Sequence, residues 1–138
     1  IYADSDKISR VFNNIIKNAI SYSFADTPIK INAYITDDSN SINKNEHNNH
    51  KTSEGTNYNV NNNYKVIINF ENQGNTIPRE KLDYIFEKFY RLDEARSTNS
   101  GGAGLGLAIA KEIVDAHNGK ISATSENNKT TFTVVLPV

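Results

Sequence analysis

The chain has 138 residues, a length typical of one domain. Its 15 Lys and Arg residues are balanced by 16 Asp and Glu residues, giving a formal net charge of −1, which argues against a broad electrostatic surface for nucleic acid or anionic lipid. Cysteine is absent, which excludes disulfide scaffolds, thiol nucleophiles and cysteine-ligated zinc, and no apolar run is long enough to span a bilayer.

The first predicted element is an amphipathic helix that begins near Asp6, with Asp4 or Ser5 as its cap. Polar Asn14 and Asn18 lie one turn apart on one flank of this helix, and Asn18 sits at the margin of the apolar arc. The apolar residues that recur at helical spacing are Ile8, Val11, Phe12, Ile15, Ile16, Ala19 and Ile20.

Two interpretations of this amide pair remain open. The amides can satisfy buried backbone groups, or they can supply carbonyl oxygens to a hard cation such as Mg²⁺, which takes few protein ligands and keeps waters and substrate phosphates. A neutral amide suits a site where a triphosphate already supplies the negative charge.

Alternating apolar residues from Ile29 to Ile35 predict a half-buried strand. A nearly continuous apolar run from Val66 to Phe70 predicts a second strand that is buried on both faces or nearly so. The segment between them is dominated by asparagine, so we expect it to join two neighbouring strands.

The asparagine-rich segment, residues 37–63, cannot bury enough apolar surface to offset its ordering entropy. We therefore expect a flexible insert within a single domain that spans residues 1–138. An asparagine-rich tract could instead act as a prion-like segment.

The second half of the chain predicts two helices and a hairpin. Pro78 suits the first position of a short helix carrying Leu82, Ile85 and Phe86. A loop and a glycine-rich segment precede a longer helix, for which Gly119 is well placed as the stop. The terminal hairpin has Asn127 and Asn128 in its turn and its core-facing residues are Phe132, Val134 and Leu136.

The order helix, two strands, short helix, loop, helix, two strands predicts an α/β fold with one mixed sheet and helices packed on one face.

Residues 101–106 are rich in glycine and run directly into a helix, an arrangement that lets backbone N–H groups approach phosphates. Neither the Walker pattern nor the Rossmann pattern fits, because Leu107 stands where each would need another residue type. A flexible loop before a helix is the competing interpretation. Arg91 and Arg96 precede the glycines and suit phosphate oxygens, although taken alone they are better explained as ordinary surface charge paired with Asp93 and Glu94.

Together these features resemble the catalytic ATP-binding domain of sensor histidine kinases, in the GHKL superfamily. The resemblance covers nearly the whole chain outside the insert. The sequence from Phe86 to Gly106 is similar to that of vancomycin-resistance-type sensor kinases. It implies the Bergerat fold, a two-layer sandwich with a mostly antiparallel sheet. The matching motifs are residues 14–19 (NIIKNA, the N box), 72–78 (NQGNTIP, the first glycine box), 86–91 (FEKFYR, the F box) and 102–107 (GAGLGL, the second glycine box).

The resemblance also implies site residues for ATP and Mg²⁺. Asn18 would ligate Mg²⁺, Asn14 would orient or polarise the reacting end, and Arg91 and Arg96 would lie near the phosphates. Asn72 would accept a hydrogen bond from the adenine amino group. The remaining nucleotide-binding residues would be Tyr22, Gly74, Ile77, Gly102, Gly104, Leu105 and Gly106.

Three residues depart from the family pattern. Asn72 replaces an aspartate, so adenine recognition survives through the amide oxygen but loses the charge-assisted contribution. Thr76 replaces a glycine, and Ser21 replaces a basic residue that many relatives carry.

The activity implied is transfer of the ATP γ-phosphoryl group to a histidine on a separate phosphoacceptor domain. Relatives that hydrolyse ATP carry glutamate at the position of Asn14, and an amide cannot take a proton from water, so this residue favours a kinase. The alternatives are an ATP-hydrolysing clamp of the gyrase or chaperone kind and a degenerate module that only binds nucleotide.

The implied partners are the dimerisation and phosphoacceptor domain of the same sensor and a response regulator. Nucleic acid and direct membrane contact are not expected. The implied location is the cytoplasm, as the cytosolic part of a membrane-anchored sensor.

Overall fold

The computed structural model describes residues 3–37, 64–92 and 104–138. Within these ranges, no helix combines the length and the hydrophobicity that a membrane span requires. The elements in chain order are α1 (Ser5–Tyr22), β1 (Lys30–Asp37), β2 (Tyr64–Gln73), α2 (Arg79–Leu82), α3 (Gly106–Ala116), β3 (Lys120–Glu126) and β4 (Lys129–Pro137).

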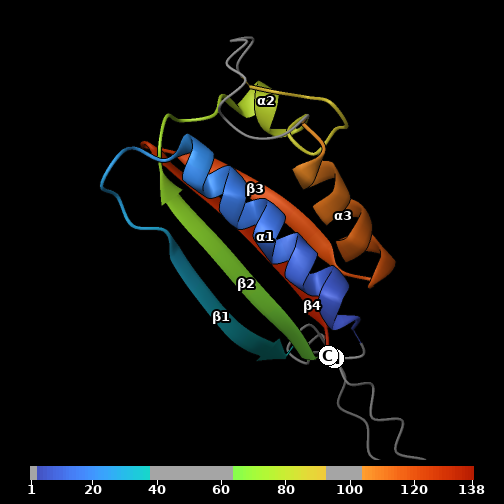
Figure 1. The fold of residues 1–138 in the computed structure, drawn as a ribbon. Helices are drawn as coiled ribbons and strands as arrows, with labels where there is room; N and C mark the ends of the chain where they lie inside the picture. Colours follow the sequence, from blue (N-terminus) through green and yellow to red (C-terminus); the bar gives the residue numbers. More distant parts are fainter. Residues whose placement is uncertain (1–2, 38–63, 93–103) are drawn as a thin grey trace, which may run out of the picture.

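The fold has two layers, a twisted sheet and a layer of helices on one of its faces (Figure 1). The four strands lie in the order β1-β2-β4-β3, and α1 packs on β2 and against α3, which in turn packs on β3. This confirms the predicted sandwich. All pairings among the described strands are antiparallel, so this part of the sheet is not mixed.

The core lies between the helices and the covered face of the sheet. Phe132, Val134 and Leu136 of β4 are buried, as their alternation predicts. Phe86 packs edge-to-face on Phe132, with ring centroids 6.3 Å apart. The other buried hydrophobic residues are Val11, Ile15, Ala19, Ile68, Phe70, Ile85, Leu107, Ala108, Ala110, Val114 and Ile121.

The strand β1 forms as predicted, but its predicted half-burial is wrong. Ile31 and Ile35 are 51% and 66% exposed. They lie on the same face as the buried Phe70, since Ile31 is the register partner of Phe70. Because α1 packs over β2, the outermost strand extends beyond the helix layer. Ile20 of α1 is also exposed, against the prediction that it belongs to the buried stripe.

The strand β2 is buried on one face and only half-buried on the other, whereas burial on both faces or nearly so was predicted. Ile68 and Phe70 are buried, whereas Ile67 and Asn69, on the other face, are half-buried. The reason is that the helices cover a single face of the sheet. The insert does join neighbouring strands, because Asp37 and Tyr64 are direct partners in the β1–β2 register.

The helix ends follow the predicted chemistry with two differences. Asp4 caps α1 by accepting hydrogen bonds from two backbone N–H groups. Pro78 precedes α2 as its N-cap instead of occupying its first position. After α3, the left-handed residue is Asn118, with φ 55°, and Gly119 instead allows close packing, since a Cβ there would meet the Val135 carbonyl oxygen at 2.5 Å.

His117 links the start of α1 to the end of α3. Its Nδ1 donates to the Ile113 carbonyl oxygen over 2.7 Å, and its Nε2 accepts from the backbone N–H of Asp4 over 3.3 Å. At the opposite end of the helix pair, α1 ends and α3 begins, and residues of both ends line a cavity.

Candidate nucleotide-binding site

Two adjoining cavities open at the end of the helix pair, close to α2. One has a volume of about 340 Å³ and the other about 440 Å³. Both are lined by the last turns of α1, and they share Asn18, Ser21 and Tyr22. We call the first the base cavity and the second the phosphate cavity, after the groups that their linings suit.

The phosphate cavity gathers seven of the predicted site residues from distant parts of the sequence. Its lining joins the middle of α1, the segment before the glycine-rich region and the beginning of α3. The predicted residues that line it, besides Tyr22, are Asn14, Asn18, Arg91, Gly104, Leu105 and Gly106.

The amide of Asn14 is in an unusual state. Its Nδ2 is buried and has no hydrogen-bond partner among the described residues. A buried donor without a partner costs about 1–3 kcal/mol. Gly106 lies beside this amide, since a Cβ at Gly106 would sit 3.6 Å from the Asn14 Oδ1. The fold therefore retains a polar group that an incoming acceptor atom could satisfy.

The start of α3 presents backbone donors to the same cavity. The N-cap residue Leu105 provides no side-chain cap, so the first N–H groups are available to an anion, and the helix dipole favours negative charge there. Gly104 has φ 73°, and a Cβ on it would lie 2.9 Å from the Tyr90 carbonyl oxygen. Glycine is required at this position because the conformation is left-handed and the chain passes close to Tyr90.

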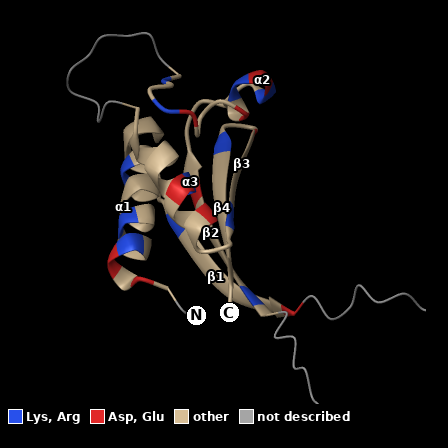
Figure 2. Cartoon of the chain, turned by 90° about the vertical axis from the view of Figure 1, so that its right-hand side faces the viewer, with Lys and Arg blue, Asp and Glu red and all other residues tan. Residues whose placement is uncertain are grey.

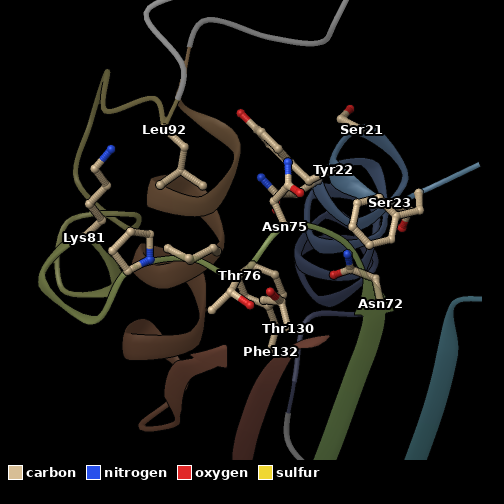
Figure 3. Close-up of a pocket in the computed structure, with 14 residues that line it drawn as sticks. Ser21, Tyr22, Ser23, Asn72, Asn75, Thr76, Lys81, Leu92, Thr130 and Phe132 are labelled. Carbon is tan, nitrogen blue, oxygen red and sulfur yellow. The ribbon is translucent and has the colours of Figure 1, made fainter. Parts of the chain in front are cut away.

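The base cavity is lined by Asn72, Ile77 and Tyr22, as predicted. Asn72 comes from the end of β2 and is only 3% exposed. Figure 3 shows its amide directed toward the cavity, with Lys81 on the opposite side in this view.

Two hydroxyl groups link the segment that carries Ile77 to the strands beneath the base cavity. The Ile77 N–H donates to the Ser125 Oγ over 2.8 Å, and the Ser125 Oγ lies 2.8 Å from the Thr130 Oγ1. Thr130 is 4% exposed and lines the cavity. The segment that carries Ile77 is thereby fixed to the β3–β4 hairpin.

Gly74, which is predicted to contact the nucleotide, is not among the described residues that line the two cavities. A Cβ on this residue would overlap the Tyr22 carbonyl oxygen. Two hydrogen bonds hold the region together: the Phe24 N–H donates to the Gln73 carbonyl oxygen over 2.8 Å and the Gly74 N–H to the Asn128 carbonyl oxygen over 3.0 Å. Gly74 therefore shapes the base cavity by letting β2 approach the end of α1.

The charge of the linings has one sign in the described part of the chain. Lys17 and Arg91 line the phosphate cavity and Lys81 lines the base cavity, and neither lining contains a carboxylate. Figure 2 shows Lys and Arg along α1 and on α2, the elements that border these cavities. Such a lining suits a polyanionic ligand.

Two predicted residues, Arg96 and Gly102, lie outside the described residues. The sequence interpretation also missed Lys81 and Thr130 as lining residues. Lys81 could have been considered from the sequence, because it lies in the first turn of the helix that follows Pro78, and Pro78 also lines the cavity. The sequence does not distinguish Thr130 from the other residues of β4. Its position beside Asn72 depends on the register between β2 and β4.

The described residues contain no group of three or more His, Asp and Glu side chains that could hold a metal ion by themselves. An ion in the phosphate cavity would need ligands from a bound phosphate. Asn18 fits that chemistry, because its neutral amide oxygen is a hard ligand in a cavity whose described lining residues include no carboxylate.

Comparison with known proteins gives a consistent assignment. The family model for "Histidine kinase-, DNA gyrase B-, and HSP90-like ATPase" matches residues 3–138. The sensor protein VanS of Enterococcus faecium is 47% identical over 137 residues, which cover 99% of this chain and 29% of VanS. The sensor protein kinase WalK of Staphylococcus aureus is 38% identical over 135 residues, covering 97% of this chain and 27% of WalK.

Solved structures agree with the sequence relatives. A mycobacterial sensor histidine kinase, MprB, superposes with a TM-score of 0.70 at 25% identity, covering 99% of this chain and 76% of that one. The catalytic domain of histidine kinase ThkA gives a TM-score of 0.65 at 26% identity, covering 98% and 68%. The chain spans less than a third of the VanS and WalK sequences. These matches confirm the resemblance found in the motifs: the chain belongs to the histidine kinase-, DNA gyrase B- and HSP90-like ATPase family.

Proposed function

We propose that this chain binds ATP with Mg²⁺ and transfers the γ-phosphoryl group to a histidine of a separate phosphoacceptor domain. The observation that carries the proposal is the phosphate cavity, where the Asn14 and Asn18 amides of α1 face the uncapped start of α3. The sensor kinases among the relatives support the same reaction.

The residues divide between the two ends of the nucleotide. Asn72, Ile77 and Tyr22 hold the base, with Gly74 shaping the wall behind them. Arg91, the N–H groups at the start of α3 and the glycines at 104 and 106 bind the phosphate oxygens. We assign the same task to Arg96, Gly102 and Leu105.

Asn18 would hold Mg²⁺ together with the phosphates. When bound, the ion neutralises charge on the phosphoryl group. The chain's own contribution is to fix Asn18 on α1 opposite the phosphate-binding backbone, so that the nucleotide is oriented by groups on both helices.

The transfer itself needs positioning more than proton abstraction. A neutral imidazole nitrogen attacks the γ-phosphorus while the bond to the bridging oxygen breaks, and ADP leaves as the imidazole proton passes to solvent. Arg91 and the backbone donors balance the phosphate charge during this step. We assign to Asn14 a hydrogen bond to the reacting end of the nucleotide, and its buried Nδ2, which has no partner among the described residues, supports this role.

The proposal can be tested with labelled ATP. The chain is incubated with Mg²⁺, [γ-³²P]ATP and the phosphoacceptor domain of the same sensor, and acid-labile, alkali-stable label is followed on that domain. We expect label on the acceptor and almost none on the chain alone. Nucleotide binding without transfer would support the degenerate module instead, which the replacements at Asn72 and Thr76 motivate.

The competing ATPase is separated by a second readout. A hydrolytic clamp would release phosphate steadily without an acceptor, and we expect negligible release because Asn14 cannot act as a base for water.

The partners and location follow the same reasoning. The dimerisation and phosphoacceptor domain of the same sensor would present the histidine, and a response regulator would receive the phosphoryl group. The chain would act in the cytoplasm as part of a membrane-anchored sensor.

A further inference from the structure

We infer that the base cavity takes 6-oxopurine nucleotides, such as those of hypoxanthine and guanine, as well as adenine nucleotides. The inference rests on the proposed function, because it requires the base cavity to hold the nucleobase. The observations that carry it are the hydrogen-bonding capacities of Asn72 and Thr130.

The Asn72 side chain is buried at the cavity wall, and no hydrogen bond to another described residue fixes its orientation. It is 3% exposed, and neither amide atom forms a hydrogen bond with another described residue. An amide presents an acceptor oxygen and a donor NH₂ group, and a half-turn about its last bond exchanges the two. A carboxylate at this position would only accept.

Thr130 has a matching freedom. It is the register partner of Asn72 across β2 and β4, and its hydroxyl lies 2.8 Å from the Ser125 Oγ, where either oxygen can be the donor. The Ser125 Oγ already accepts from the Ile77 N–H. If Ser125 donates to Thr130, the Thr130 hydroxyl can donate into the cavity. If Thr130 donates to Ser125, its oxygen can accept from the cavity.

The two side chains can therefore match either kind of purine edge. Adenine offers an amino donor at C6 beside an acceptor at N1, which calls for the Asn72 oxygen and a donating Thr130. A 6-oxopurine offers an acceptor oxygen at C6 beside a donor N1–H, which calls for the Asn72 NH₂ and an accepting Thr130. Both arrangements give the C6 substituent and N1 of the base a complementary hydrogen-bonding group of the chain.

The remaining charge in the cavity does not oppose an oxo group. Lys81 is the only ionic side chain lining the base cavity among the described residues, and it is a donor. None of the described residues that line this cavity carries a negative charge that would repel the oxygen at C6.

The first test measures the binding of ADP, IDP, GDP and CDP to the chain by titration calorimetry in the presence of Mg²⁺. IDP is the sharpest probe, because it differs from ADP only at the C6 and N1 edge. We expect IDP to bind within about tenfold of ADP, since one neutral hydrogen bond is exchanged for another. Binding of IDP more than about 100-fold weaker than ADP would overturn the inference.

The second test replaces the Asn72 amide with a carboxylate, which can accept hydrogen bonds but cannot donate them. In Asn72→Asp, we expect ADP to bind several-fold more tightly and IDP at least about tenfold more weakly, because a carboxylate accepts from the adenine amino group and repels O6. An unchanged ADP-to-IDP ratio would overturn the inference. The matched control is Asn69→Asp on the opposite face of β2, where Asn69 Oδ1 accepts from Thr133 Oγ1 over 2.8 Å, and there the ratio should stay as in the parent chain.

The outcomes separate this inference from the proposed function. Failure of ADP itself to bind would overturn the proposed function. Tight ADP binding with IDP excluded would overturn only the inference. Binding of CDP as tight as that of ADP would also overturn it, since the base would then not be read at all. The ratio of ADP to IDP affinity is measured on the parent chain, so this test does not depend on whether a variant folds.

Discussion

Gly74 lies so close to the Tyr22 carbonyl that no side-chain atom fits between them. This approach joins the end of β2 to the end of α1, and so places Asn72 and Tyr22 on two walls of one cavity. Replacement of Gly74 by alanine should therefore disturb both the fold and the site.

For Gly74→Ala, we expect the free energy of unfolding to fall by about 1–3 kcal/mol, because the added methyl group meets backbone that cannot move aside easily. ADP affinity should fall as well. Urea denaturation measures the first effect and calorimetry the second. Gly106→Ala is the control for stability, since its Cβ would find its nearest atoms at 3.6 Å, an ordinary contact. Equal stability of the Gly74 and Gly106 variants would contradict the account of this contact.

The unpartnered amide of Asn14 predicts a separation of stability from activity. For Asn14→Ala, we expect a free energy of unfolding equal to or above that of the parent chain, because removal of an unsatisfied buried donor relieves a cost of about 1–3 kcal/mol. Phosphotransfer to the acceptor domain should be lost.

The matched control for this prediction is Asn13→Ala, one residue earlier on the exposed side of α1. It should leave phosphotransfer unchanged. A marked loss of stability in Asn14→Ala would show that its amide is satisfied in solution and is not held for a ligand.

Asp4 predicts a pH-dependent contribution to stability. Hydrogen bonding from the Lys7 N–H is the main cause that lowers the pKa of this carboxyl. Because the pKa is lower in the folded chain than in the unfolded chain, the stabilisation is present above the ordinary value of about 3.9 and is lost as the pH falls through the folded value.

Asp4→Asn isolates this effect, because asparagine also caps helices but does not titrate. The melting temperature of the parent chain minus that of the variant should shrink as the pH falls from about 5 to about 2. A difference that is constant over this range would contradict the assignment.

The connection between β1 and β2 predicts that the insert is dispensable. Asp37 and Tyr64 are direct partners, so Asn-Gly in place of residues 38–63 would make a two-residue hairpin. We expect stability to be unchanged or raised by up to about 2 kcal/mol, because loop-closure cost grows slowly with length. A loss comparable to that of a core deletion, measured by thermal unfolding, would show that the insert packs on the domain.

Local patterns predicted the elements and much of the site. The amphipathic stripe of α1, the hairpin turn at Asn127 and the glycines before α3 each act within a few residues, so the sequence reveals them directly. The motifs then identified the family, and through it the residues of both cavities.

Burial at the edge of the sheet was not predictable in the same way. Ile31 and Phe70 are register partners on one face of the sheet, and only the position of α1 over β2 decides that one is exposed and the other buried. The role of Gly74 was also out of reach, since its close neighbour Tyr22 is distant in sequence and the contact exists only in the folded chain.

The most direct test of the central claim is the Mg²⁺ dependence of ADP binding in the parent chain and in Asn18→Ala, with Asn13→Ala as control. The account predicts that Mg²⁺ tightens ADP binding by the parent chain and the control, and that Asn18→Ala loses this increment while its Mg²⁺-free affinity stays close to that of the parent. An Asn18→Ala variant that kept the full Mg²⁺ increment would contradict the placement of the metal and the phosphates between α1 and α3.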